Sequence, residues 1–267
     1  MTAPTSAATG GTIHVTDAGI AWHFSTLRRG ISTGMCRGGL NHYQHFYNHR
    51  LRQFFPHERD FPGGSVPAYL MTAMLEAGIS ASDSTAMITS ARMDWHAYAC
   101  RTFDDLIVEG IATAGVEQTA ARAGDPAYYY EKDGEYLPVG TINLMLSTNA
   151  ALPDPILVKS CLTATEAKTA VLQDTGVVSL QSGLSATGTG TDGLMIASDP
   201  AGPVRTDAGT HSKLGELIAV VVRDMLTFTF ENYPAPWNAF ISAQTPPPIA
   251  PAELENARHR YFNEKNR

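Results

Sequence analysis

The most regular pattern of apolar residues in the chain runs from Lys213 to Thr227. Its apolar positions recur at spacings of three and four, which predicts an amphipathic helix. Two further helices are predicted, over Pro67–Glu76 and over Pro155–Gln173. The segment Pro155–Gln173 is apolar on nearly all sides, so we expect that helix to be buried.

The aromatic and histidine-rich segment that begins at Asn41 predicts a fourth helix, because Asn41 is a suitable N-cap and the segment continues to about Phe54. Alternation of apolar and polar residues predicts a hairpin over Thr12–Phe24, with its turn at residues 17–19. Further strands are predicted at Gly30–Cys36, Thr85–Thr89, Trp95–Phe103, Leu106–Thr113, Thr141–Ser147 and Leu194–Ser198. Since helices and strands intermix, we predict an α/β fold, a single domain built on a mixed β-sheet with packed helices.

The ends of the chain differ in composition from its middle. Residues 1–10 are rich in Thr, Ala, Ser and Gly and are predicted to be disordered, and residues 11–243 form the predicted domain. Residues 244–267 combine a proline-rich linker with a polar tail, and residues 123–138 are expected to form an exposed hairpin or long loop.

Charge and composition exclude several classes of protein. A formal net charge of −7 argues against a general nucleic-acid binder. No apolar run reaches the roughly 18 residues of a membrane span, and the first residues do not resemble a secretory signal. The three cysteines suggest neither a disulfide framework nor a zinc motif. We therefore expect a cytoplasmic protein with a small-molecule partner; the oligomeric state is left open.

Candidate chemistry concentrates in the second half of the chain. Glu166 lies on the helix expected to be buried, where desolvation would raise the pKa of its carboxyl toward that of a general acid or base. Lys168 is two residues further, about 200° around the helix, so the two side chains need other partners. The alternative for Glu166 is a simple ion pair with an arginine.

Two more segments carry groups that can transfer protons. Thr187–Gly193 alternates threonine and glycine up to Asp192, which would allow positive φ angles and close approach of a ligand to the backbone. His211 precedes the helix that begins at Lys213, and the positive end of that helix would keep its imidazole neutral and able to act as a base. The alternatives are a surface turn for the first segment and a capping or surface role for His211.

The first half of the chain offers a candidate metal site. His42, His45 and His49 would share one face of the predicted helix and could hold a divalent metal. Cys36 has no evident base beside it in the sequence, which argues against a thiol nucleophile. No cofactor is required by the sequence, and a divalent metal stays an alternative.

Four segments in series resemble the adenosylcobinamide amidohydrolase family: Gly140–Asn143, Thr163–Lys168, Thr187–Gly193 and Gly209–Ile218. Weaker matches lie in the first half, and the resemblance covers about residues 31–226. The weaker matches are Ser32-Thr33, Gly38-Gly39, Asn48, Met87 to Ala91 and Thr113 to Gly115.

The resemblance implies hydrolysis of the amide that joins aminopropanol to the corrin ring, with adenosylcobyric acid as product. From the residues we infer that His211 or Glu166 activates water and that Asp192 orients the base or the leaving amine. Donors and charges for the substrate are expected from Asn143, Thr141, Lys168, Thr187, Gly188, Thr189, Gly190, Thr191 and Lys213. Aromatic residues that could line a cleft are Trp22, Tyr43, Phe46, Trp95 and residues 128–130.

Two alternatives differ in substrate and in chemistry. One is a hydrolase of the same fold that acts on another amide or lactam, with help from a metal on the histidines. The other is a module that binds a corrinoid without turnover.

Overall fold

The computed structural model describes residues 5–53, 55, 57–116, 119–127 and 141–233 of the chain. Three α-helices lie in this part: α1 (Val66–Glu76), α2 (Asp154–Asp174) and α3 (Lys213–Asn232). The strands there are β1 (Thr5–Ser6), β2 (Thr12–Val15), β3 (Gly19–Ser32), β4 (Gly39–Arg50), β5 (Ser84–Thr89), β6 (Ala97–Phe103), β7 (Leu106–Ala114), β8 (Ala120–Ala121), β9 (Ile142–Thr148), β10 (Gly188–Thr189) and β11 (Gly193–Ser198).

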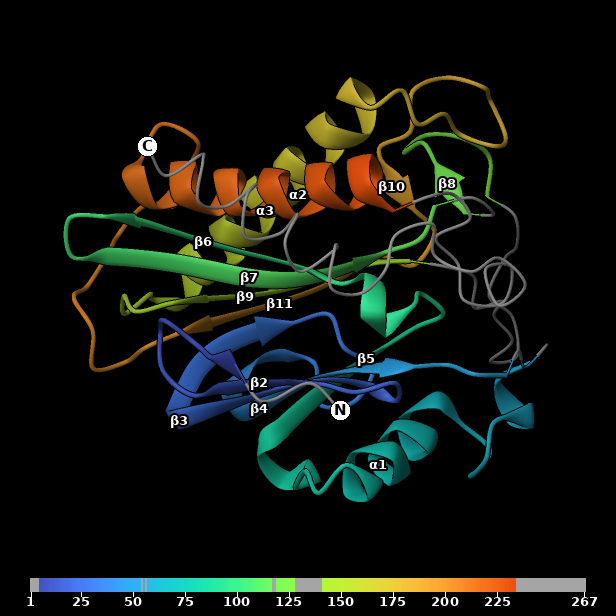
Figure 1. The fold of residues 1–267 in the computed structure, drawn as a ribbon, viewed down its shortest axis with the longest axis horizontal. Coiled ribbons are helices and arrows are strands. Elements are labelled where there is room, and N and C mark those ends of the chain that lie inside the picture. Colours follow the sequence, from blue (N-terminus) through green and yellow to red (C-terminus); the bar gives the residue numbers. More distant parts are fainter. Residues whose placement is uncertain (1–4, 54, 56, 117–118, 128–140, 234–267) are drawn as a thin grey trace.

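The long strand β3 joins two layers of one sheet. Its first part pairs with β2, its second part pairs with β11, and β4 pairs with both parts. The register with β4 shifts between His23 and Arg28, where an irregularity lets a strand bend. The sheet thereby folds over itself, with β2, β4 and β5 in a first layer and β6, β7, β9 and β11 in a second (Figure 1).

Helices cover the outer faces of both layers, so the described part of the chain has four layers (Figure 1). Side-chain alternation along β3 divides the core, because successive residues point to opposite faces. Ile20 and Trp22 pack between the two sheet layers, whereas Ala21 packs toward α1. The largest apolar cluster lies between the second layer and helices α2 and α3.

Two parallel strand pairs give the fold its α/β character. β4 and β5 are parallel and flank α1 in sequence, and β9 and β11 are parallel and flank α2. Parallel neighbours need a crossover connection, which each helix supplies. Because β9 and β11 are parallel, both begin at the same edge of the sheet, where Asn143 pairs with Gly193. The predicted α/β fold on a mixed sheet is confirmed.

The helix predicted from Asn41 to Phe54 is wrong, because residues 39–50 form strand β4. Tyr47 and His49 point toward α1, whereas Phe46 and Asn48 point between the layers. This alternation has period two, and aromatic side chains favour pleated, half-buried surfaces.

The ends of the predicted domain are described in part. Residues 5–10 fall within the stretch predicted to be disordered, yet Thr5–Ser6 form β1 and pair with β2. Residues 128–140 and 234–267, which include most of the predicted loop and the proline-rich tail, lie outside the described residues. None of the helices described is long and apolar enough to cross a membrane.

Candidate functional site

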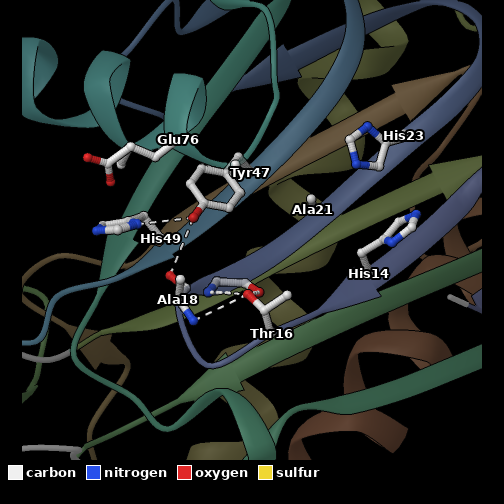
Figure 2. A pocket seen from close by; sticks show the side chains of 11 residues that line it. His14, Thr16, Ala18, Ala21, His23, Tyr47, His49 and Glu76 are labelled. Atoms are coloured by element: carbon white, nitrogen blue, oxygen red, sulfur yellow. Dashed lines mark hydrogen bonds between the residues drawn. The ribbon is translucent and has the colours of Figure 1, made fainter. Parts of the chain in front are cut away.

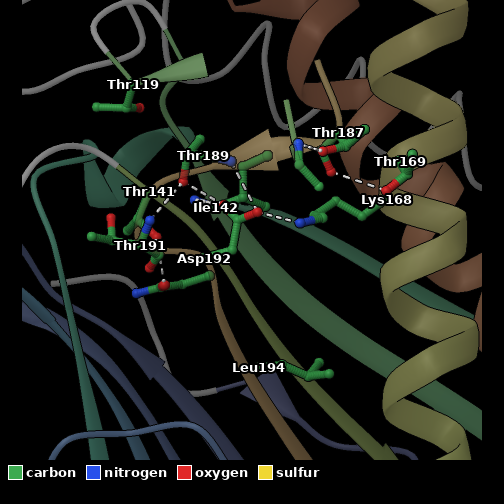
Figure 3. A network of polar contacts seen from close by, with 12 residues as sticks. Thr119, Thr141, Ile142, Lys168, Thr169, Thr187, Thr189, Thr191, Asp192 and Leu194 are labelled. Carbon is green, nitrogen blue, oxygen red and sulfur yellow. Dashed lines mark hydrogen bonds and ion pairs between the residues drawn. The ribbon is translucent and has the colours of Figure 1, made fainter. Parts of the chain in front are cut away.

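The starts of β9 and β11 bring Thr141, Asn143 and Asp192 together at one edge of the sheet. Figure 3 shows Thr141 and Asp192 with Lys168 and the neighbouring threonines. Asp192 directly precedes Gly193, the residue paired with Asn143. A β-carbon at Gly193 would lie 2.5 Å from the amide oxygen of Asn143, so only glycine permits this close approach. We call these residues, with Lys168 and Thr189, the Asp192 site.

The carboxylate of Asp192 accepts several hydrogen bonds. It receives the backbone N–H of Thr189 at 3.0 Å and that of Ile142 at 3.2 Å, together with the hydroxyl of Thr189. It also forms an ion pair with the ammonium group of Lys168, whose side chain is 10% exposed against 18% for Asp192. Both charged groups are largely removed from water, so their ion pair is favourable only if its geometry is good and further hydrogen bonds satisfy the charges. The N–H groups of Thr189 and Ile142 and the hydroxyl of Thr189 supply such bonds to the Asp192 carboxylate.

The threonine and glycine segment before Asp192 forms β10, which pairs with β8. Gly188, Gly190 and Gly193 do not adopt the positive φ angles that glycine would allow. Gly188 instead allows close approach: a β-carbon there would lie 2.3 Å from a carboxylate oxygen of Asp192 and 2.6 Å from Nζ of Lys168. Thr187 is used structurally, since its hydroxyl accepts the N–H of Ala123 and its carbonyl accepts the hydroxyl of Thr169.

A chain of buried amides connects the two halves of the sequence. Asn143 donates to the side-chain oxygen of Asn48 at 2.7 Å and to the carbonyl of Ile88 at 3.0 Å. Asn48 in turn donates to the hydroxyl of Thr113 at 2.9 Å. Both amide hydrogens of Asn143, predicted to serve the substrate, are therefore donated within the protein. Asn48 and Thr113 were not predicted as site residues. Both belong to the weaker family matches in the first half of the chain, which could have identified them.

The end of β3 adds hydroxyl groups next to the same edge. Ser32 and Thr85 share a hydrogen bond of 2.8 Å, and Thr85 donates to the carbonyl of Cys36 at 2.9 Å. Thr33 is exposed, and its hydroxyl accepts the N–H of Leu194 at 2.9 Å, immediately after Gly193. Cys36 is buried, and burial raises the pKa of its thiol, which disfavours a thiolate nucleophile.

Glu166 lies on the opposite face of α2 from Lys168. The face that contains Glu166 is exposed to solvent, and Leu162 on the same face is 61% exposed. The expectation that this helix is apolar all round and buries Glu166 is therefore wrong. Lys168, in contrast, is buried and reaches the Asp192 site.

His211 and Lys213 have partners other than the residues of the Asp192 site. His211 is 76% exposed in its side chain and lies 2.7 Å from a carboxylate oxygen of Asp207, which also binds Lys159 at 2.8 Å. Lys159 is nine residues from Lys168, about 14 Å along the helix. The Lys213 ammonium pairs with Glu216 at 2.6 Å. The structure thus does not bring His211 or Lys213 to the Asp192 site.

The histidines of β4 do not form the expected metal site, because they lie on a strand. Residue 42 pairs with Arg29, beyond the register shift in the pairing of β3 with β4, whereas His45 pairs with His23 and bonds its Nδ1 at 2.8 Å. His49 instead bonds the hydroxyls of Tyr47 at 3.2 Å and Tyr69 at 2.9 Å. Within the described residues, no group of three or more His, Cys, Asp or Glu side chains is arranged to hold a metal. The predicted three-histidine ligand set is therefore wrong.

The predicted aromatic lining of a cleft is largely core. Trp22, Tyr43 and Phe46 are fully buried, and Trp95 is 3% exposed and stacks on Tyr233. Residues 128–130 lie outside the described part of the chain.

The Asp192 site offers the groups that acyl chemistry needs. Lys168 supplies a positive charge, and residues 189–191 line the turn that carries the carboxylate, with Gly190 and Thr191 exposed to solvent. An ammonium group held near a carbonyl oxygen stabilises the negative charge that develops there during hydrolysis. A carboxylate beside it can take a proton from water.

Comparisons with known proteins identify a family that matches most of the chain. A family model described as adenosylcobinamide amidohydrolase matches residues 4–235. The chain is similar to the uncharacterized protein MJ1613 of Methanocaldococcus jannaschii, at 38% identity over 159 residues, which are 55% of this chain and 62% of that protein. The match thus spans less than two thirds of that relative's length.

Two more distant similarities were found. An adenosylcobinamide amidohydrolase of Halobacterium salinarum is 27% identical over 173 residues, which are 65% of this chain and 70% of that protein. The crystal structure of the PH0078 protein from Pyrococcus horikoshii OT3 aligns with a TM-score of 0.45 and 10% identity, over 84% of this chain and 81% of that chain.

Proposed function

The chain belongs to the adenosylcobinamide amidohydrolase family, and on that basis we propose that it hydrolyses the amide of adenosylcobinamide to give adenosylcobyric acid and aminopropanol. Water adds to the amide carbonyl carbon, the C–N bond breaks, and the amine leaves with a proton. The products are a carboxylic acid and an amine. The reaction needs a group to stabilise the oxyanion and a group to accept and return the proton.

The observation that supports this proposal is the meeting of family motifs from both halves of the chain at one edge of the sheet. Asn48 and Thr113 come from the first half, and Asn143 and Asp192 come from the second. Hydrogen bonds join these residues, which are as many as 95 positions apart in the sequence. The Asp192 site, together with Asn48 and Thr113, therefore has chemical groups from both halves of the chain within reach of one another, and a catalytic role depends on such mutual geometry.

We assign the two charged groups of the Asp192 site to the two chemical tasks. The Lys168 ammonium turns toward the carbonyl oxygen as negative charge develops, and Asp192 accepts the proton of the attacking water. The hydrogen bonds from Thr189 and Ile142 keep the carboxylate in place while its ion pair with Lys168 opens. Asn143 and Asn48 act as positioning residues, because their amides hold the start of β9 rather than a ligand.

The test is turnover of adenosylcobinamide by the purified full-length protein, with adenosylcobyric acid detected by mass spectrometry. We expect Lys168→Met and Asp192→Asn each to reduce kcat/KM at least about 100-fold, since removing one stabilising group of this kind costs two to three orders of magnitude. Lys159→Met is the matched control: it removes a lysine of the same helix that pairs with Asp207 instead. It should keep wild-type turnover.

The other outcomes separate the alternatives. Corrinoid binding seen by absorbance without product would favour the binding module, and turnover of another amide alone would change the substrate. Glu166→Gln and His211→Ala distinguish this assignment from the one based on sequence. A large loss of turnover in either variant, with Lys168→Met active, would overturn the roles given to Lys168 and Asp192.

A further inference from the structure

A pocket of about 400 Å³ lies between the outer face of the first sheet layer and α1 (Figure 2). Its floor consists of small residues of the β2–β3 hairpin and of α1, which leaves room for a ligand against the backbone. The lining residues are His14, Thr16, Ala18, Gly19, Ala21, His23, Tyr47, His49, Ala73, Glu76 and Ala77.

This pocket is separate from the Asp192 site. Tyr47 and His49 line the pocket, whereas Asn48 between them points the other way and bonds Asn143. Strand β4 therefore stands between the two places, and the pocket does not depend on the function proposed for the Asp192 site.

The lining has one formal charge, the carboxylate of Glu76, and contains neither lysine nor arginine. Burial lowers the pKa of His23 and of His49 to about 4, so both imidazoles are neutral near pH 7. Arg52 also lowers the pKa of His49, but its own charge is paired with Asp17 at 2.8 Å. A lining of this kind favours a cation over an anion.

The hydroxyl groups of the lining are already used within the wall. Thr16 donates to the carbonyl of Gly19 at 3.1 Å, and Tyr47 contacts both His49 and the carbonyl of Ala18. In contrast, no described residue bonds Nδ1 of His14 or Nε2 of His23, whose other ring nitrogens bond Thr12 and His45. A neutral imidazole nitrogen either donates or accepts, depending on the tautomer, which suits a hydroxyl or amide group.

The two kinds of group lie at opposite ends of the pocket. Figure 2 shows Glu76 beside Tyr47 and His49, with His14 and His23 beyond Ala21 on the other side. We propose that the pocket binds a small organic amine, with its ammonium group at Glu76, a flat or apolar middle over Ala21, and a neutral hydroxyl or amide group at His14 and His23.

Tyramine is a suitable probe, because it has an ammonium group, an aromatic ring and a hydroxyl in that order. Binding to the full-length protein is measured by isothermal titration calorimetry at pH 7. 4-Hydroxyphenylacetate replaces the ammonium with a carboxylate, and phenethylamine lacks the hydroxyl. Glu76→Gln removes the charge at an exposed position, and Asp174→Asn, an exposed carboxylate at the end of α2, is the matched control.

We expect saturable tyramine binding that is weakened about tenfold in Glu76→Gln and unchanged in Asp174→Asn. 4-Hydroxyphenylacetate should bind at least tenfold more weakly than tyramine, and His14→Phe should remove the advantage of tyramine over phenethylamine. The proposal is overturned if tyramine does not saturate, if the acid binds as well as the amine, or if Glu76→Gln binds like the wild type. Circular dichroism of each variant shows whether a loss reflects unfolding.

Discussion

Replacing Gly188 by alanine tests whether the Asp192 site requires glycine for close approach. The new β-carbon would lie 2.3 Å from Asp192 and 2.6 Å from Lys168, well inside ordinary contact distance. The carboxylate cannot move by roughly 1 Å without stretching its bonds to the N–H groups of Thr189 and Ile142. Overpacking of this kind costs about 1–3 kcal/mol. Relief of the chain entropy of glycine offsets about 0.5 kcal/mol of that cost.

The assay is urea unfolding of Gly188→Ala beside Gly190→Ala. Gly190 belongs to the same threonine and glycine segment, but a β-carbon there meets nothing within 4 Å. Its free energy of unfolding should therefore change by less than about 0.5 kcal/mol, while Gly188→Ala shows a lower urea midpoint with an unchanged m-value. Equal losses in both variants, or a neutral Gly188→Ala, would refute the reasoning that the ion pair occupies the space beside Gly188.

Three further outcomes are expected. Asn48→Ala should lower the free energy of unfolding by about 2–6 kcal/mol in urea titrations, because two buried polar partners at roughly 1–3 kcal/mol each lose their hydrogen bonds; a loss below 1 kcal/mol would contradict this. The pKa values of His23 and His49 are about 4 in the folded protein, whereas the ordinary value, expected in the unfolded chain, is 6.5. Between pH 4 and 6.5 the unfolded state therefore binds more protons than the folded state, and stability should fall as pH drops through this range. Replacing both histidines by glutamine should flatten that slope, and an unchanged pH profile would show that other groups dominate. Glu109→Gln should speed amide hydrogen exchange at Thr9, since the fully buried Glu109 carboxylate accepts that N–H at 2.6 Å; unchanged protection there would mean that other contacts hold the N-terminal segment.

Hydrophobic periodicity predicted most helices and strands correctly where a segment fitted only one period. The helix predicted from Lys213 begins at that residue, where the side chain of Ser212 accepts the N–H of Gly215 at 3.1 Å. It continues to Asn232, beyond the predicted end, because its apolar face remains packed on β6 and β7. The segment from Asn41 failed because its histidines also fit helical spacing, and only pairing with β3 and β5 selects the strand.

The candidate site shows the same division. Asp192, Thr141 and Lys168 were predicted together, and the structure brings them into one network. Glu166 was misplaced because α2 departs from the usual pattern at two positions: it buries Lys168 and exposes Leu162. The number of apolar residues alone could not show which face of the helix meets the sheet.

The sequence by itself determined the family, the order of its motifs and the α/β class, because motif spacing and hydrophobic periodicity are local properties of the chain. Only the tertiary structure decided which motifs share a site. The bend in β3 brings the two layers together and places Asn48 against Asn143, whereas α2 separates His211 from Asp192. Contacts between residues this far apart depend on strand pairing and on the length of a packed helix, which no local pattern encodes.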